Sequence, residues 1–191
     1  MTRSRPTGPD SVLRSDGTCD PMSDPFVDWL RAASADLYID LDYLLATDGP
    51  ALEWFRDVFC DAGPVSVSRL RLLSEEATER SARDALGIMR REASFFHKRM
   101  PDGGIEERDS MEVPGKRGFY FLGRESHAWT LQSAIIEIGE AVQDEIMERD
   151  QEAWPVCELH GSGLHLKRLQ EKVVWWCRPG SHAYRVIYSP S

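Results

Sequence analysis

Apolar side chains recur every three or four residues from Val27 to Leu44, which is the spacing of one helical face. This pattern predicts a helix over residues 24–47, with Pro25 at a position that suits the first turn. The Asp-Gly-Pro sequence at its end stops the pattern. Residues 37–41 also alternate between apolar and polar side chains, as a strand would. We favour the helix.

Three further elements are expected before residue 100. Pro50 opens a second helix with one apolar face, which Asp-Ala-Gly-Pro at residues 61–64 ends. Cys60 lies in an apolar stretch of this helix and is predicted to be a small core residue. Valines alternate with serines at the start of segment 65–73, so this segment is predicted to be a strand. Ser74 then starts a helix that runs to about His97.

The middle of the chain contains turn signals, a short strand and the clearest helix. Residues 99–117 hold an Asp-Gly-Gly and a Pro-Gly sequence, which indicate a loop or a loose hairpin. The aromatic segment 118–123 is predicted to be a strand. Ser126 is expected to cap a helix that reaches about Arg149.

The last of these helices has two opposite stripes. Its apolar positions follow helical spacing, and its acidic positions are offset from them by two residues, or about 200°. We therefore expect Ile135, Ile138 and Val142 to be buried and the acids to be exposed, namely Glu137, Glu140 and Asp144.

From Trp154 onward, short strands around tight turns are expected at 173–177 and 184–188. The predicted fold class is α+β, a mostly helical body with a few short strands and a small C-terminal β-hairpin. The expected organisation is a disordered polar leader at 1–22, an α-rich domain at 23–150 and a small β module at 151–191.

Composition limits the partners. The formal net charge of -9 repels phosphate backbones, so general binding of nucleic acid or of anionic membranes is disfavoured. No apolar run approaches the roughly 20 residues that cross a bilayer. The polar first residues do not resemble a secretory signal, so we expect a cytoplasmic protein.

Cysteine and histidine gather near the C-terminus. Cys157 and His160 are separated by two residues, and Cys177 and His182 by the four residues Arg-Pro-Gly-Ser. Each spacing suits a tight turn, and thiolate and imidazole are the ligands that zinc prefers. These four residues are the candidate Zn²⁺ ligands, with His165 as a possible substitute for His182 or His160.

Two pairs of ligands on two turns joined by a hairpin resemble the zinc-ribbon family over residues 154–188. This chain has C-x-x-H and C-x-x-x-x-H where zinc ribbons usually have two C-x-x-C sequences. The alternative is a hairpin without metal, in which Trp154, Trp175 and Trp176 form the core around two buried free cysteines.

The sequence contains no G-x-G-x-x-G, G-x-x-x-x-G-K-[ST] or G-x-S-x-G motif, so no nucleotide loop or nucleophile elbow is indicated. We therefore expect a non-enzymatic interaction or regulatory protein with a structural zinc site, and the acidic surface suggests that its partner is another protein. The alternative is a metal-dependent hydrolase that uses the C-terminal Cys/His cluster.

Overall fold

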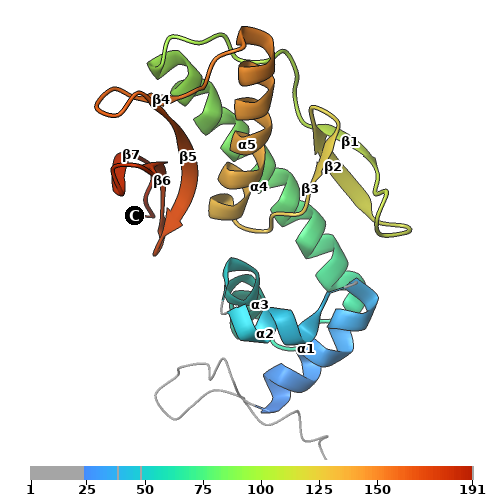
Figure 1. Cartoon of the computed structure of the whole chain (residues 1–191). Helices are drawn as coiled ribbons and strands as arrows, with labels where there is room; N and C mark the ends of the chain where they lie inside the picture. The colour runs from blue at the N-terminus through green and yellow to red at the C-terminus, as the bar shows by residue number, and fades with distance from the viewer. Residues whose placement is uncertain (1–23, 38, 48, 191) are drawn as a thin grey trace, which may run out of the picture. The chain divides into compact units, whose positions relative to one another are not determined.

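The structure is a computed structural model that describes residues 24–37, 39–47 and 49–190, and this part of the chain forms five helices and two antiparallel sheets (Figure 1). The predicted α+β class is confirmed. The predicted disordered leader lies outside the described residues. The chain divides between Val67 and Ser68 into two compact units.

The first unit contains α1 (Asp24–Leu37), α2 (Leu41–Thr47) and α3 (Pro50–Ala62). The prediction of one continuous helix over 24–47 is wrong, because the chain forms two helices there. Oδ1 of Asp40 accepts a hydrogen bond of 2.9 Å from the backbone N–H of Tyr43. An aspartate in this position starts a new helix by satisfying a free N–H of its first turn.

Helices α1 and α3 share an aromatic core. Ring centroids lie 5.4–6.0 Å apart in an edge-to-face or tilted arrangement, among Phe26, Trp29, Phe55 and Phe59. Cys60, next to Phe59 on α3, is exposed. The prediction of a core cysteine at this position is therefore wrong.

Helix α4 (Val67–Phe95) begins seven residues before the predicted start at Ser74, so the predicted strand at 65–73 is wrong. Leu70, Ser74 and Thr78 are buried on one face of this helix. The Ser74 hydroxyl donates to the Arg71 carbonyl at 2.7 Å, and the Thr78 hydroxyl donates to the Ser74 carbonyl at 2.8 Å. Two hydroxyl side chains are therefore buried in this helix, and backbone carbonyls of the preceding turn accept their hydrogen bonds. A sequence pattern that assigns only apolar residues to the buried face does not detect such positions.

The first sheet has the strand order β1-β2-β3, with β1 (Glu106–Asp109), β2 (Arg117–Phe121) and β3 (Arg124–Ser126). Of the two alternatives for residues 99–117, the hairpin is the one observed. Leu122 and Gly123 join β2 to β3 with φ angles of 49° and 77°. Two left-handed residues in succession form the tight turn that suits the twist of a hairpin.

Helix α5 (Leu131–Asp150) is capped by Thr130, whose side chain accepts from the N–H of Ser133. The prediction that Ser126 caps this helix is wrong. Ser126 is buried at the end of β3, and its hydroxyl donates to Oε2 of Glu137 at 2.8 Å. A glutamate of the first turns of α5 therefore holds the end of β3 against the helix.

The two stripes of α5 are largely as predicted. Ile135, Ile138 and Val142 are at most 3% exposed. Glu140 and Asp144 are exposed, whereas Glu137 is half-buried and accepts hydrogen bonds from the Ser126 hydroxyl and the His127 N–H.

The second sheet has the order β4-β5-β6-β7, with β4 (Val156–Cys157), β5 (Ser162–Leu169), β6 (Lys172–Cys177) and β7 (His182–Tyr188). The two predicted C-terminal strands are confirmed within β6 and β7. Strand β5 was not predicted. Its central position makes the module a four-stranded sheet rather than a single hairpin.

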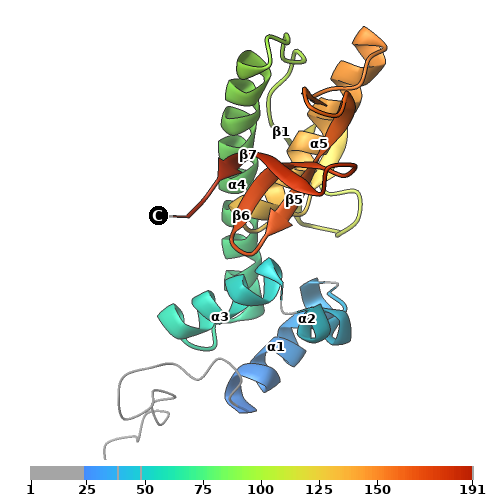
Figure 2. The ribbon, with the colours of Figure 1, turned by 60° about the vertical axis from the view of Figure 1, so that its left-hand side comes forward.

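Helix α5 packs against β3 of the first sheet and against β5 and β6 of the second, and Figure 2 shows β5 and β6 beside it. One hydrophobic core joins α4 and α5 to the second sheet, and it includes Met89, Ile138, Trp175, Cys157 and Cys177. The sheet that carries the cysteines therefore shares its interior with the helices. Whether residues 151–191 also fold as a separate domain stays a prediction.

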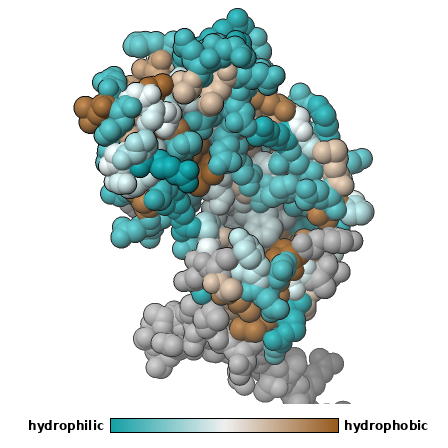
Figure 3. Space-filling view, in the orientation of Figure 1, coloured by the Kyte–Doolittle hydropathy of each residue, from teal (hydrophilic) through white to brown (hydrophobic). Residues whose placement is uncertain are grey.

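The described residues on the face shown in Figure 3 are largely hydrophilic, and the hydrophobic ones form small separate groups. This is expected when most large apolar side chains are buried in the core. Among the described helices, none has both the length and the apolar composition needed to cross a membrane.

Candidate metal centre

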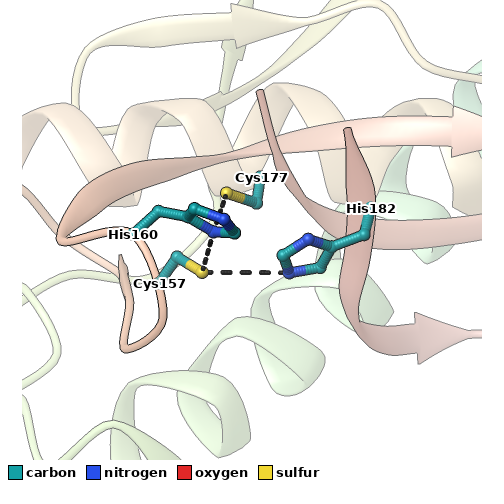
Figure 4. A group of neighbouring side chains, drawn as sticks. All are labelled: Cys157, His160, Cys177 and His182. Atoms are coloured by element: carbon teal, nitrogen blue, oxygen red, sulfur yellow. Dashed lines mark hydrogen bonds between the residues drawn. The ribbon is translucent and has the colours of Figure 1, made fainter. Parts of the chain in front are cut away.

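Two neighbouring turns of the second sheet carry the four candidate ligands. Cys157 ends β4 and Cys177 ends β6, and each is followed by a four-residue turn. His160 lies in the first turn, and His182 is the first residue of β7. Figure 4 shows the four side chains converging on one point from these elements.

Local hydrogen bonds shape both turns. The Cys157 carbonyl accepts from the backbone N–H groups of His160 and Gly161, at 3.2 and 2.8 Å. Gly161 has a φ of 60°, a left-handed conformation that favours glycine. In the second turn the N–H of Ser181 donates to the Arg178 carbonyl at 3.2 Å. The first turn thus brings the His160 ring back over the cysteine that precedes it.

The donor atoms lie close together. Nδ1 of His160 is 3.4 Å from the sulfur of Cys157 and 3.4 Å from the sulfur of Cys177. Nε2 of His182 is 3.8 Å from the sulfur of Cys157. All four donor atoms lie within 4.8 Å of one another.

These distances match a tetrahedral site. Zinc bonds of about 2.3 Å to sulfur and about 2.0–2.1 Å to nitrogen place the donors roughly 3.3–3.8 Å apart along the edges of a tetrahedron. Three of the six donor separations, at 3.4, 3.4 and 3.8 Å, fall in that range, and all six are within 4.8 Å. The residues present therefore fit a tetrahedral ion with two sulfur and two nitrogen ligands.

The two sides of the cluster differ in exposure. Both cysteines are fully buried and belong to the hydrophobic core, whereas His160 is exposed and His182 is half-buried. An ion at this position would be shielded on its sulfur side and would face solvent only past the imidazole rings.

Hydrogen bonds around Cys177 favour its thiolate. Burial raises the pKa of this thiol, but hydrogen bonds with the Gly180 N–H and with the Cys157 and Ser162 side chains outweigh burial and lower the pKa below its ordinary value. The Ser162 hydroxyl lies 3.8 Å from the sulfur. A thiolate is the form of cysteine that binds a metal.

Gly180 is required by the two histidine rings. A Cβ atom at this position would lie within 3.0 Å of ring atoms of both His160 and His182, closer than real Cβ contacts. In the sequence, Gly180 is recognisable as a turn residue, but not as a contact of the two rings. The signal for that contact is its position between Cys177 and His182, because the turn joins these two candidate ligands.

The structure brings together all four primary candidates but not the possible substitute. His165 is exposed on β5, where it pairs with Trp176, and it is not part of the four-residue group. Trp154 and Trp175 are buried in the core, whereas Trp176, the third tryptophan of the alternative without metal, is half-buried. Two of the three tryptophans therefore share a core with the two cysteines.

No protein-family model, no curated protein and no solved structure matches this chain. What can be inferred about its function rests on the geometry described above.

Proposed function

We propose that Cys157, His160, Cys177 and His182 hold one structural Zn²⁺ ion, and that the protein is a non-enzymatic interaction or regulatory protein whose C-terminal sheet this ion stabilises. The observation that carries the proposal is the convergence of two thiols and two imidazoles within 4.8 Å. Two sulfurs and two nitrogens would fill all four positions around a tetrahedral ion, which is typical of structural zinc.

The position of the ligands supports a structural role. The ion would join the β4–β5 turn to the start of β7, two segments that the sheet places at opposite edges. Because both cysteines also belong to the core shared with α4 and α5, binding would stabilise the packing of the sheet on the helices.

A catalytic zinc ion needs an open coordination position and a nearby general base. The group found among the described residues has four protein donors and no carboxylate. Glu158, the acid nearest in sequence, is not one of the four donors. The hydrolase alternative therefore has no specific observation in its favour.

The test is a metal analysis combined with X-ray absorption on the purified protein. We expect about one equivalent of zinc, coordinated by two sulfur and two nitrogen atoms. Three protein ligands and one water would instead support the hydrolase. Protein that contains no metal and still protects residues 154–188 from protease would overturn the zinc proposal and leave a tryptophan-packed sheet.

A further inference from the structure

The outer face of the second sheet has a hollow of about 290 Å³ beside the Cys/His cluster. It is lined by one aromatic residue, one aliphatic residue and three residues that carry or can carry positive charge, namely Trp176, Leu166, His165, Lys167 and Arg178. Strand pairing places His165 directly opposite Trp176. The site therefore combines an aromatic surface with cationic groups.

The cationic groups of this hollow have no acidic partner among the described residues. Within the described part of the chain, neither Lys167 nor Arg178 forms an ion pair with a carboxylate, and His165 forms none either. Other cations of the same unit are paired, such as Lys98 with Asp150 at 2.9 Å and Arg185 with Glu92 at 3.1 Å. The charges at the hollow are thus available to a ligand.

The charge of the C-terminal segment differs from that of the chain. Residues 151–191 contain five Lys/Arg and three Asp/Glu, whereas the whole chain has a net charge of -9. An anionic ligand would be repelled by most of the molecule and attracted to this surface. This uneven charge distribution directs an anion to the C-terminal segment and disfavours its binding elsewhere on the surface.

The contact between Lys167 and Trp176 indicates which kind of anion fits. Nζ of Lys167 lies 4.1 Å from the centroid of the indole ring, so a cation already occupies one face of the ring. Nucleic-acid strands bind to such surfaces by stacking bases on an open aromatic face. A covered indole beside unpaired cations is better suited to carboxylate side chains, which pair with the cations while their aliphatic groups contact the ring edge.

The hollow is connected to the metal ligands through the chain. Trp176 and Arg178 are the immediate neighbours of Cys177. An ion bound to Cys177 would fix the end of β6 and the start of the turn, and with them two of the residues that line the hollow.

We propose that the hollow formed by His165, Lys167, Trp176 and Arg178 is a docking site for an acidic peptide segment of a protein partner, and that the metal ion holds its two residues next to Cys177 in place. The second clause rests on the proposed zinc site. The first stands on the hollow and its unpaired charges.

The test measures fluorescence anisotropy of a short labelled peptide of alternating glutamate and serine, with the full-length zinc-loaded protein. Binding should weaken as salt is added. Lys167→Ala should bind about threefold more weakly, and Lys167→Ala combined with Arg178→Ala about tenfold, as expected for exposed ion pairs. Lys172→Ala is the matched control, because this exposed lysine lies at the start of β6, the strand that carries Trp176, but does not line the hollow. Its affinity should equal that of the wild type.

Two results would overturn the docking proposal. An equal loss of affinity in Lys172→Ala would indicate unspecific charge attraction. Tighter binding of a single-stranded oligothymidine of the same charge would indicate a nucleic-acid surface. The zinc content of each sample separates the two proposals. Zinc-containing protein that does not bind the peptide contradicts the docking site alone. Metal-depleted protein that binds with unchanged affinity contradicts the role of the metal in holding the site.

Discussion

Trp175 on β6 donates its indole N–H to Oε2 of Glu92 on α4 at 3.0 Å, across 83 residues of sequence. The carboxylate is only 4% exposed and also accepts from Nε of Arg185 on β7, at 3.1–3.2 Å. One buried acid thus fixes two strands of the second sheet on a helix. An acid buried in this way is tolerated because charged and polar donors satisfy it.

Replacing Glu92 should therefore destabilise the fold. Glu92→Ala leaves a buried indole N–H and the Arg185 guanidinium without their acceptor, and the free energy of unfolding should fall by about 3 kcal/mol. Glu92→Gln keeps an acceptor for Trp175 and should lose less. Asp84→Ala, at an exposed position of the same helix, should stay within about 0.5 kcal/mol of the wild type in urea unfolding. Equal effects of Glu92→Ala and Asp84→Ala would contradict the role of this contact.

Helix α5 offers a second matched pair. Ile138 is 3% exposed, so Ile138→Ala removes core contacts and should lower the free energy of unfolding by about 2–4 kcal/mol. Glu140 is exposed, and Glu140→Ala should change it by no more than about 0.5 kcal/mol. Circular dichroism in urea measures both. Similar losses would mean that the helix is buried on all sides.

The two histidines of the β4–β5 region should differ in their effect on the metal. His160→Ala removes one of four donors, and the purified protein should no longer contain a stoichiometric amount of zinc. His165→Ala leaves all four donors in place and should retain about one equivalent. Zinc lost from His165→Ala but retained by His160→Ala would show that the wrong histidine has been assigned.

A methyl group at Gly180 should disturb the same site without removing a ligand. Its Cβ would contact both histidine rings, so Gly180→Ala should lower zinc affinity by about 10- to 100-fold, as changes next to metal ligands do. Gly163→Ala is the control, because the nearest atom to its Cβ, on Ala153, is at an ordinary distance of 3.6 Å. Competition with a chromogenic chelator measures both affinities. Unchanged affinity in Gly180→Ala would mean that the rings do not pack on this turn when the metal is bound.

The sequence predicted the long apolar stripes of helices well, but it predicted poorly where helices begin and end. The stripe of α5 is visible because Ile135, Ile138 and Val142 are themselves apolar. The start of α4 is not, because valines and serines alternate at residues 65–68 as they would in a strand, although the helix already begins at Val67. The break between α1 and α2 was missed because the second helix starts where Oδ1 of Asp40 accepts a hydrogen bond from the Tyr43 N–H, which no pattern of hydropathy contains.

The four candidate ligands could be selected from the sequence because their residue types and spacing suit a metal site, and the structure brings them together. Cys157 and His160 share one turn, so their proximity follows from local geometry alone. The exclusion of His165 could not be derived in this way. It depends on β5, in which Leu164 faces the core and the next residue therefore faces outward. Without that strand, nothing distinguished His165 from the other histidines.

The separation of the ligands along the chain has a consequence for the unfolded protein. Cys157 and His182 are 25 residues apart in sequence. An ion that stays bound to both in the denatured chain closes a loop of this length, and the polymer relation used for crosslinks assigns to such a closure about 3.5 kcal/mol of lost chain entropy. The ion would then limit the conformations open to the random coil, and the zinc-loaded protein would expose less surface on denaturation than the metal-free protein does.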